Sequence, residues 1–575
     1  MPIFTPRRTL ANWNFFRADD RLLLIVIALM VGICSGLAAL ALNRSLAAVL
    51  TWLHPYRGQV WAFVLPGVGA ALSSLFLNKV VNEGAGHGVP EVVYAVSRHG
   101  GLLRFRSSYS RLISSFLTIG SGGSAGPEAP VVMSGAAIGS NIAKYFSLND
   151  RQRTTLVGCG AAGAIASIFN APIAGMVFAV EVILGEWSAR NIIPIAMAAV
   201  AGTEVSRILQ GNQIAFEYRH FDIHLVDIAA SAGLAVAAAL ASVLLTRALR
   251  ATHRLSGLLV VPAWVRAALG GCLVGLIGLR LPVVLGEGYH AIDEMIGGHF
   301  ASGLLIAAAA ALAKVLATAL TLGSGGSGGI FAPSLVIGSL VGLVYHRALI
   351  WIWPAIGLVN EGCFALLGMA GLISGMLQAP LTGIFLIVEL TGGYETILPL
   401  IIVSTIATTL SHYFEPASYY LRDLVERGQL LRPGTDRRVL TDMSVREMLE
   451  TDCVGVAPEM RLREFIEVVK RSRRNYFPVS DPRSGIFLGI VYLDDIRPYL
   501  FDPLLYDAVV VGQFMHADVQ VASPDDDLHE VLRRMDTERR FSMPVVFNGR
   551  FLGMISKATL LDRYRRELMV QTHWR

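Results

Sequence analysis

A run of 21 uncharged, mostly apolar residues near the start of the chain limits what the chain can fold into. The run covers residues 22–42, LLLIVIALMVGICSGLAALAL, and about 20 such residues let a helix cross the core of a bilayer. Similar runs recur near 59–79, 192–203, 225–246, 302–322, 334–352 and 396–411. Charged residues make up 16% of the 575 residues, against about 25% in soluble domains. The sequence predicts a multi-pass integral protein of a plasma or inner membrane.

Residues 1–21 contain arginines directly before the first apolar run. Positive residues stay on the cytoplasmic side of a membrane, so we expect a cytoplasmic N-terminal segment. No small-residue cleavage site follows closely, which indicates a retained span. The five cysteines form no CxxC pair and predict neither disulfides nor a zinc site. The net charge of +5 gives no reason to expect nucleic acid as a partner.

Charge density divides the chain near residue 430. Residues 431–575 hold 44 of the 91 Asp, Glu, Lys and Arg residues, and the longer preceding part holds the other 47. We assign 426–438 (ERGQLLRPGTDRR) as a linker to a cytoplasmic α/β domain. This domain is a tandem, since Pro478 and Pro544 lie in similar short apolar segments. We expect a first module at 439–505 and a second at 506–575, each reading helix, strand, helix, strand, strand, helix.

The membrane part is duplicated as well. GSGGSAGPEAP at 120–130 recurs as GSGGSGGIFAP at 323–333, an offset of 203. FNAPIAGMVFAVEV at 169–182 recurs as LQAPLTGIFLIVEL at 377–390, an offset of 208. Two motifs in the same order predict an all-α domain over 22–425 with homologous halves at roughly 22–210 and 225–425. With both chain ends assigned to the cytoplasm, inverted-repeat halves are favoured.

Each glycine-rich motif ends in Ala-Pro and continues into an apolar helical segment. This pattern is typical of a helix that begins inside the membrane, with Pro130 and Pro333 in the first turn. The free N–H groups and positive dipole ends of two such helices favour an anion. They would hold it without a full positive charge that could prevent its release. The alternative is that the glycines only let helices approach closely.

Glu128 is the main difference between the two motifs, because its counterpart is Phe331. A carboxylate at the mouth of an anion site can occupy that site as a tethered competitor and leave when protonated. Ionisable residues inside a membrane are functional candidates, so we interpret Glu128 as a gate. The alternative is that Glu128 only caps a helix N-terminus.

These motifs resemble those of the CLC family of chloride channels and proton-coupled chloride exchangers. GGIFAP (328–333), GPEAP (126–130) and GHGVPE (86–91) match family segments, and the tail resembles a pair of CBS modules. The resemblance implies a homodimer with one anion pathway per subunit. It also implies an anion site at His87, Ile330, Phe331 and Tyr420. The helix starts that it marks are at Gly86, Gly88, Gly126, Pro130, Gly329 and Pro333.

Three departures from the family pattern bear on mechanism. His87 replaces a serine, which changes the donor and adds charge when protonated. Pro127 replaces a basic residue before Glu128, so we expect the gate to open at less acidic pH. Val182 stands where proton-coupled exchangers usually have a glutamate, and this favours a passive chloride channel. A proton-coupled exchanger stays open as the alternative.

Three further charged residues of the membrane part need an interpretation. Glu181 and its repeat counterpart Glu389 are expected to be buried structural carboxylates. Lys314 either adds positive potential to the anion vestibule or snorkels towards the membrane surface.

The tail has only some of the residues with which CBS modules usually bind a nucleotide. Asp495 lies where CBS modules usually place a ribose-binding carboxylate, and Ser556 where they place a phosphate-binding hydroxyl. The complementary positions are Tyr492 and Thr559, so we expect at most one adenine-nucleotide site. A purely structural tail is the alternative. We expect chloride as substrate and no required cofactor, metal site or catalytic residue.

Two other function classes are weaker fits. A CBS-regulated cation transporter would need more carboxylates within the spans than this sequence has. An intramembrane serine hydrolase would use Ser124 as nucleophile and His87 as base. The repeat argues against it, because Ser327 duplicates Ser124 without a comparable second histidine.

Overall fold

The computed structural model describes residues 20–56, 59–82, 88–211, 216, 220–427, 443–472, 474–538 and 540–572. These residues form two compact units that divide near residue 430. The predicted linker 426–438 lies mostly outside the described residues, as does most of the N-terminal segment 1–21.

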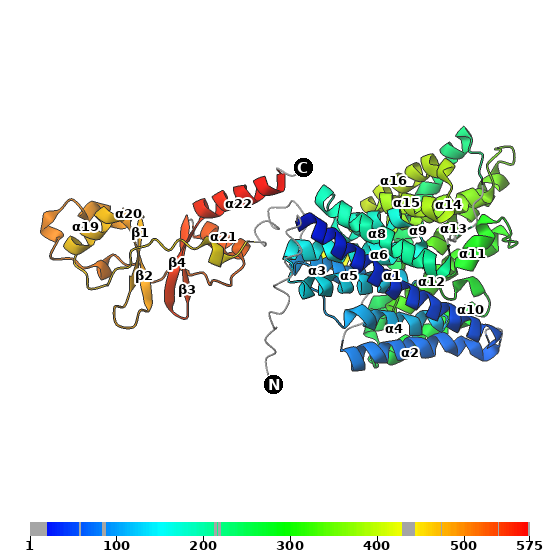
Figure 1. Ribbon diagram of the computed structural model, residues 1–575, viewed down its shortest axis with the longest axis horizontal. Helices are drawn as coiled ribbons and strands as arrows, with labels where there is room; N and C mark the ends of the chain where they lie inside the picture. The colour runs from blue at the N-terminus through cyan, green and yellow to red at the C-terminus, as the bar shows by residue number, and fades with distance from the viewer. Residues whose placement is uncertain are drawn as a thin grey trace. The chain divides into compact units, whose positions relative to one another are not determined.

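The described part of the first unit contains two successive sets of α-helices (Figure 1). Each set has eight helices, and the short α17 (Arg422–Glu426) follows the second set. The first set is α1 (Asp20–Leu53), α2 (Leu65–Leu75), α3 (Val89–Arg98), α4 (Ser107–Gly120), α5 (Glu128–Tyr145), α6 (Asp150–Phe169), α7 (Pro172–Phe178) and α8 (Ala189–Gln210). The second set is α9 (Leu225–Leu258), α10 (Ala263–Gly278), α11 (Tyr289–Ile296), α12 (Leu304–Gly323), α13 (Phe331–Ile352), α14 (Glu361–Leu377), α15 (Pro380–Thr391) and α16 (Ile397–Phe414).

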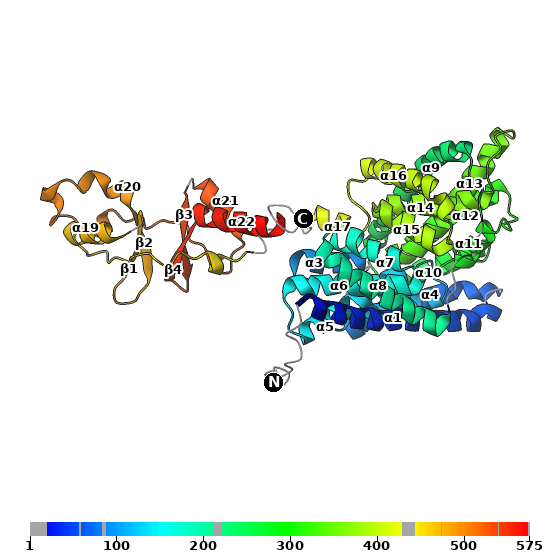
Figure 2. The same cartoon turned by 45° about the horizontal axis from the view of Figure 1, so that its top comes forward.

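Equivalent helices of the two sets begin at equivalent residues. Helix α5 begins at Glu128 and α13 at Phe331, while α7 begins at Pro172 and α15 at Pro380. Equivalent helices also meet across the halves, since α2 packs on α10 and α7 packs on α15 (Figure 2). The predicted duplication therefore extends from the motifs to whole helices.

Seven helical segments within the described residues are long and apolar enough to cross a membrane. They are Leu22–Leu53, Val60–Val81, Ala189–Gln210, Leu225–Leu258, Leu304–Gly323, Phe331–Ile352 and Tyr394–Phe414. Others, such as Pro172–Leu184 and Pro380–Thr391, are apolar but shorter. The predicted integral membrane character is confirmed, and the short helices are the reason that hydropathy alone does not give the number of crossings.

Glycines away from the repeated motifs let helices of each half approach closely. A Cβ added at Gly135 of α5 would lie 2.2 Å from the carbonyl oxygen of Gly160 in α6. The equivalent Cβ at Gly338 of α13 would lie 2.5 Å from the carbonyl oxygen of Gly368 in α14. Such contacts exclude any larger residue, as small-residue helix interfaces in membranes require.

Each half supplies one glutamate that caps a helix of the other half. Glu181 accepts hydrogen bonds from the backbone N–H of Leu381 (3.2 Å) and of Thr382 (2.8 Å), at the start of α15. Glu389 accepts from the N–H of Ile173 (3.0 Å) and of Ala174 (2.7 Å), at the start of α7. Each carboxylate thus satisfies free N–H groups of the other half. Both are partly buried and hold structural contacts.

The second unit contains two antiparallel two-stranded sheets, each flanked by helices. The first has β1 (Tyr476–Ser480) and β2 (Phe487–Tyr492), with α19 (Leu462–Arg471) and α20 (Leu493–Ile496). The second has β3 (Ser542–Phe547) and β4 (Arg550–Ser556), with α21 (Leu528–Thr537) and α22 (Lys557–Thr572). Isolated parallel bridges, Val456↔Val479 and Ala522↔Val545, join one preceding residue to each sheet. This is the expected order of a CBS-like tandem.

The two halves of the tail exchange their leading segments. Val445 and Met448 belong to the apolar core formed by β3, β4 and α21, although they precede the first half in sequence. Val511 and Phe514 contribute to the core around β1, β2 and α19. The segments cross over, so each apolar core needs residues from both sequence modules.

We expect Glu389→Ala to destabilise the membrane unit, because two N–H groups at the start of α7 would lose their acceptor. The cost should be about 1–3 kcal/mol and lower the midpoint of thermal unfolding of the detergent-purified protein. Glu204→Ala removes a carboxylate from the exposed Arg207–Glu204 pair and should change stability by less than about 1 kcal/mol. Equal midpoints for the two variants would contradict a capping role for Glu389.

Candidate functional site

The two glycine-rich motifs meet through their backbones. The N–H of Gly126 donates to the carbonyl of Gly329 (2.8 Å), and the N–H of Gly329 donates to the carbonyl of Gly126 (2.6 Å). This antiparallel bridge joins equivalent positions of the two repeats. Reciprocal bonds between equivalent residues require a local two-fold relation, as inverted repeats provide. Helices α5 and α13 therefore start from one shared point.

Hydroxyl groups hold the same two motifs on either side of this bridge. The N–H of Ser124 donates to the hydroxyl oxygen of Thr321 (3.0 Å), and the N–H of Ser327 donates to that of Thr118 (3.1 Å). The hydroxyl of Ser124 also hydrogen-bonds that of Thr318 at 3.0 Å. All five residues are buried. The polar groups of the non-helical backbone are thus satisfied within the protein, which the membrane interior requires.

The first turns of α5 and α13 are buried at this meeting point. Pro130 and Pro333 are each the third residue of their helix, within the expected first turn. Ile330 and Phe331 are both 1% exposed. The Phe331 ring lies 5.6 Å from that of Phe169, measured between centroids. N–H groups at a helix start have no partner in their own helix and can receive an anion.

The carboxylate of Glu128 is directed at the start of the opposite half's helix. Its Oε2 accepts from the N–H of Ala332 in α13 (3.4 Å), and its Oε1 accepts from the hydroxyl of Tyr289 (2.5 Å). Glu128 is 1% exposed. A Cβ added at Gly126 would lie 2.0 Å from Oε2, so a larger residue there would displace the carboxylate from this position. Glu128 thus accepts a hydrogen bond at a helix N-terminus, as the capping alternative supposes. The helix that it caps is α13, and not α5, which Glu128 itself begins.

A third repeated motif was not predicted from the sequence. GHGVPE at 86–91 has a counterpart, GEGYHA, at 286–291. In both, a glycine with positive φ directly precedes a helix: Gly88 (82°) before α3 and Gly288 (86°) before α11. The shared G-x-G pattern was the available signal. Gly86 and His87 lie outside the described residues.

This third pair identifies two residues near Glu128. Tyr289, the hydrogen-bond donor to Glu128, is the first residue of α11. Glu287 occupies the position equivalent to His87 and has one buried carboxylate oxygen with no hydrogen-bond partner among the described residues. It lies within electrostatic range of Glu128 and Lys314. The sequence alone gave no reason to connect Tyr289 and Glu287 with Glu128.

Lys314 is 0% exposed, so the snorkelling alternative is wrong. Its ammonium group donates to the carbonyl oxygens of Val284 (3.1 Å) and Gly286 (3.0 Å). These bonds fix the segment that leads into α11. The buried Lys314 side chain therefore lies near Glu287 and supports the loop that carries Tyr289.

Tyr420 and Val182 come from other parts of the membrane unit. Tyr420 lies between α16 and α17, is 2% exposed, and is within electrostatic range of Glu128. Val182 is 8% exposed and lies in a π-helical turn, Ala179–Leu184, that continues α7. Its apolar side chain offers no group that can take up a proton.

In the tail, Ser556 is engaged by an internal carboxylate. Glu450, 7% exposed, accepts hydrogen bonds from the hydroxyls of Ser556 (2.5 Å), Thr559 and Tyr476 (2.5 Å), and pairs with Arg474 (2.8 Å). Burial raises the pKa of Glu450, but the three hydroxyl bonds and the Arg474 charge more than offset this and leave its pKa below the usual value. Glu450 thus joins both halves of the tail.

Asp495 has a different partner. Its Oδ2 lies 2.8 Å from Nε2 of His516, and both side chains are about two-fifths exposed, at 41% and 42%. Asp495 and Ser556 are therefore each engaged in separate internal contacts. No group of three His, Cys, Asp or Glu side chains that could hold a metal is found among the residues that the structure describes.

The family model for voltage-gated chloride channels matches residues 69–412. This range includes the helix starts at Val89, Glu128, Tyr289 and Phe331. The chain belongs to this family. A CBS-domain model matches residues 511–566 of the tail.

Relatives of this CLC protein include proteins named as channels and as exchangers. A ClcB-like chloride channel protein of Ralstonia nicotianae is 30% identical over 71% of this chain and 98% of the relative. The H+/Cl− exchange transporter ClcA of Klebsiella pneumoniae is 29% identical over 69% of this chain and 87% of the relative. The crystal structure of a slow cyanobacterial Cl−/H+ antiporter shares the fold, with a TM-score of 0.64 at 23% identity. It is matched over 72% of this chain and 99% of that structure.

We expect Glu450→Gln to loosen the tail, measured in the full-length protein by hydrogen exchange of peptides from β1 and β4. The loss should be about 1–3 kcal/mol at neutral pH. The folded state lowers the pKa of Glu450, so its contribution is present above the unfolded pKa and is lost as pH falls through the folded pKa. The difference from wild type should therefore shrink in acid. The exposed Glu447→Gln variant serves as control, and a pH-independent difference would contradict this role.

Proposed function

We propose that this protein conducts chloride across the membrane through a pathway that Glu128 gates. The observation that carries the proposal is the position of the Glu128 carboxylate, which comes from one half and lies against the first-turn N–H of Ala332 in the other half. A negative group held there occupies donors that an anion could use. Protonation or displacement of Glu128 would free them.

The anion site that we propose uses donors without a full charge. The N–H groups of Ile330 and Phe331 begin a buried helix, and the Tyr420 hydroxyl adds a side-chain donor. We propose His87 as a further donor in place of the usual serine. Such donors favour anions over cations and bind weakly enough to let the ion leave.

We favour a passive pathway over proton-coupled exchange because Val182 supplies no proton-transferring group. The alternative is an H+/Cl− exchanger, the activity named for the ClcA relative. One observation supports it: Glu287 places a second, partly buried carboxylate within electrostatic range of Glu128. In an exchanger, Glu287 would take the role of proton donor to the gate.

The assembly that we propose is a homodimer with one anion pathway in each subunit and both chain ends in the cytoplasm. For the tail we propose two CBS-like modules joined through Glu450. Because Ser556 and Thr559 already bond Glu450, the tail is better suited to a structural role than to an adenine nucleotide.

The two distant alternatives have less support. In a serine hydrolase, Ser124 would hydrogen-bond a general base, whereas its hydroxyl bonds that of Thr318. A cation transporter would present carboxylates or carbonyl oxygens where α5 and α13 begin, whereas these helix starts present N–H donors. Chloride transport by a CLC protein fits both observations.

We expect Glu128→Gln to raise chloride efflux from reconstituted liposomes at neutral pH to about the level that the wild type reaches in acid. The amide fills the same space but cannot compete as an anion, so the flux should lose its pH dependence. Ser124→Ala is the matched control, because it should leave the pH dependence intact and would abolish a hydrolase. Flux that is as pH-dependent in Glu128→Gln as in wild type would contradict the gate assignment.

The same liposomes separate the two transport modes. External pH is recorded during chloride efflux while a potassium ionophore and then an uncoupler are added. A passive pathway predicts chloride efflux without linked proton movement. Proton uptake against a gradient would establish the exchanger, and Glu287→Gln should then abolish the proton movement.

We expect Tyr289→Phe to increase chloride flux at neutral pH. It removes the 2.5 Å hydrogen bond that holds the Glu128 carboxylate in place, and a bond to a charged group is worth about 1.5–3 kcal/mol. The open fraction should rise by about tenfold where the gate is mostly closed. Tyr345→Phe is the control, because its hydroxyl bonds the carbonyl of Ala230 instead. Equal flux in the two variants would contradict the role of Tyr289 in holding the Glu128 carboxylate in place.

A further inference from the structure

A cavity rich in arginine lies near the ends of two membrane-spanning helices, and neither Glu128 nor Tyr289 lines it. It has a volume of about 430 Å³ and is lined by residues of α9, of α16 and of the segment that leads into α17. Four of its lining residues are arginines, and one, Glu415, is acidic. The cavity therefore carries an excess of positive charge.

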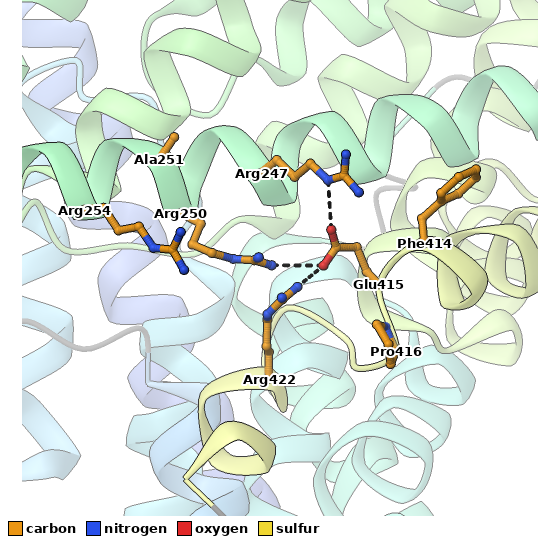
Figure 3. A pocket seen from close by; sticks show the side chains of 8 residues that line it. All are labelled: Arg247, Arg250, Ala251, Arg254, Phe414, Glu415, Pro416 and Arg422. Atoms are coloured by element: carbon orange, nitrogen blue, oxygen red, sulfur yellow. Dashed lines mark hydrogen bonds and ion pairs between the residues drawn. The ribbon is translucent and has the colours of Figure 1, made fainter.

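The arginines come from one face of α9 and from α17. Arg247, Arg250 and Arg254 are spaced three and four residues apart, which puts them on the same side of the helix. Arg422 is the first residue of α17 and approaches from the opposite side (Figure 3). Two separate elements thus converge on one space, unlike a run of basic residues on a solvated surface.

Glu415 fixes the orientation of three of these side chains. Arg247 Nε donates to its Oε1 (3.0 Å), and Arg250 Nη2 donates to its Oε2 (3.0 Å). Arg422 also donates to Oε2 (Figure 3). Glu415 is 6% exposed and is itself held, since its carbonyl accepts from Gln378 (2.6 Å). The guanidinium groups are therefore held in position before any ligand arrives.

One carboxylate cannot satisfy four guanidinium groups. Each has five N–H donors and cannot lose its charge. Arg254 is exposed and has no ion pair among the described residues, and Arg422 has a second partner in Glu426 at 2.7 Å. The arginines with unused donors line an open cavity, which a purely structural cluster of balanced ion pairs would not leave.

We propose that this cavity binds a phosphate-bearing anion, held by Arg247, Arg250 and Arg254 and supported by Arg422. Guanidinium groups match phosphate oxygens in paired hydrogen bonds. The cavity lies where the spans Leu225–Leu258 and Tyr394–Phe414 both end. Basic pockets between membrane helices at this level suit phosphorylated lipid headgroups, and a soluble polyphosphate carries the same chemistry.

The test uses the full-length protein in phosphatidylcholine nanodiscs and measures the midpoint of thermal unfolding. Inorganic pyrophosphate is titrated in one arm, and phosphatidic acid replaces part of the phosphatidylcholine in the other. The test variant is Arg247→Gln with Arg254→Gln, because both side chains are largely exposed and their loss should not prevent folding. The control is Arg190→Gln with Arg280→Gln, two exposed arginines outside the cavity.

We expect the probes to raise the midpoint of the wild type and of the control variant. The test variant should need about tenfold more probe, which corresponds to about 1.4 kcal/mol, since it loses at least one charged hydrogen bond to the phosphate. A response to phosphatidic acid alone identifies a lipid headgroup, and a response to pyrophosphate alone identifies a soluble phosphate. Either supports the proposal. It would be overturned if neither probe stabilised the wild type, or if the control variant lost as much affinity as the test variant.

Discussion

Two hydrogen bonds between the backbones of Gly126 and Gly329 fix the centre of the membrane unit. They join the same position of two repeats, so the starts of α5 and α13 are brought to one point. Backbone that leaves a helix inside a membrane must find partners within the protein. Here each repeat supplies them to the other, through this bridge and through the hydroxyls of Thr118 and Thr321. A single half would leave these groups unsatisfied.

The same exchange is repeated with side chains. Glu181 and Glu389 each cap the helix start of the opposite half, and Glu128 extends from α5 to α13. The first two are counterparts of each other in the two repeats. Glu128 has no acidic counterpart, because Phe331 stands in its place. The two repeats differ at this position, so the bond from Glu128 to α13 has no reciprocal bond in the other direction. The carboxylate can therefore leave without breaking a second bond, which makes Glu128 a candidate gate.

Buried charge is used differently at three places in the protein. Lys314 bonds only backbone carbonyl oxygens among its described hydrogen bonds and so supports the loop before Tyr289. Glu450 gathers three hydroxyls and an arginine, and so links the two halves of the tail. Glu415 orients three arginines without neutralising them. Only in the last case is charge left over beside an open space, which is the reason to infer a ligand there.

The sequence by itself determined the membrane character, the division near residue 430 and the duplication, because apolar length, charge density and repeated motifs are local properties of the chain. It also identified Glu128, because an ionisable residue is unusual in a glycine- and proline-rich motif between apolar segments. It did not reveal Tyr289, Glu287, Glu450 or the partners of Lys314. These residues acquire their surroundings only when segments up to 161 residues apart, as for Tyr289 and Glu128, meet in space. Hydrogen bonds between such distant segments depend on how the two halves pack, and no local pattern encodes that.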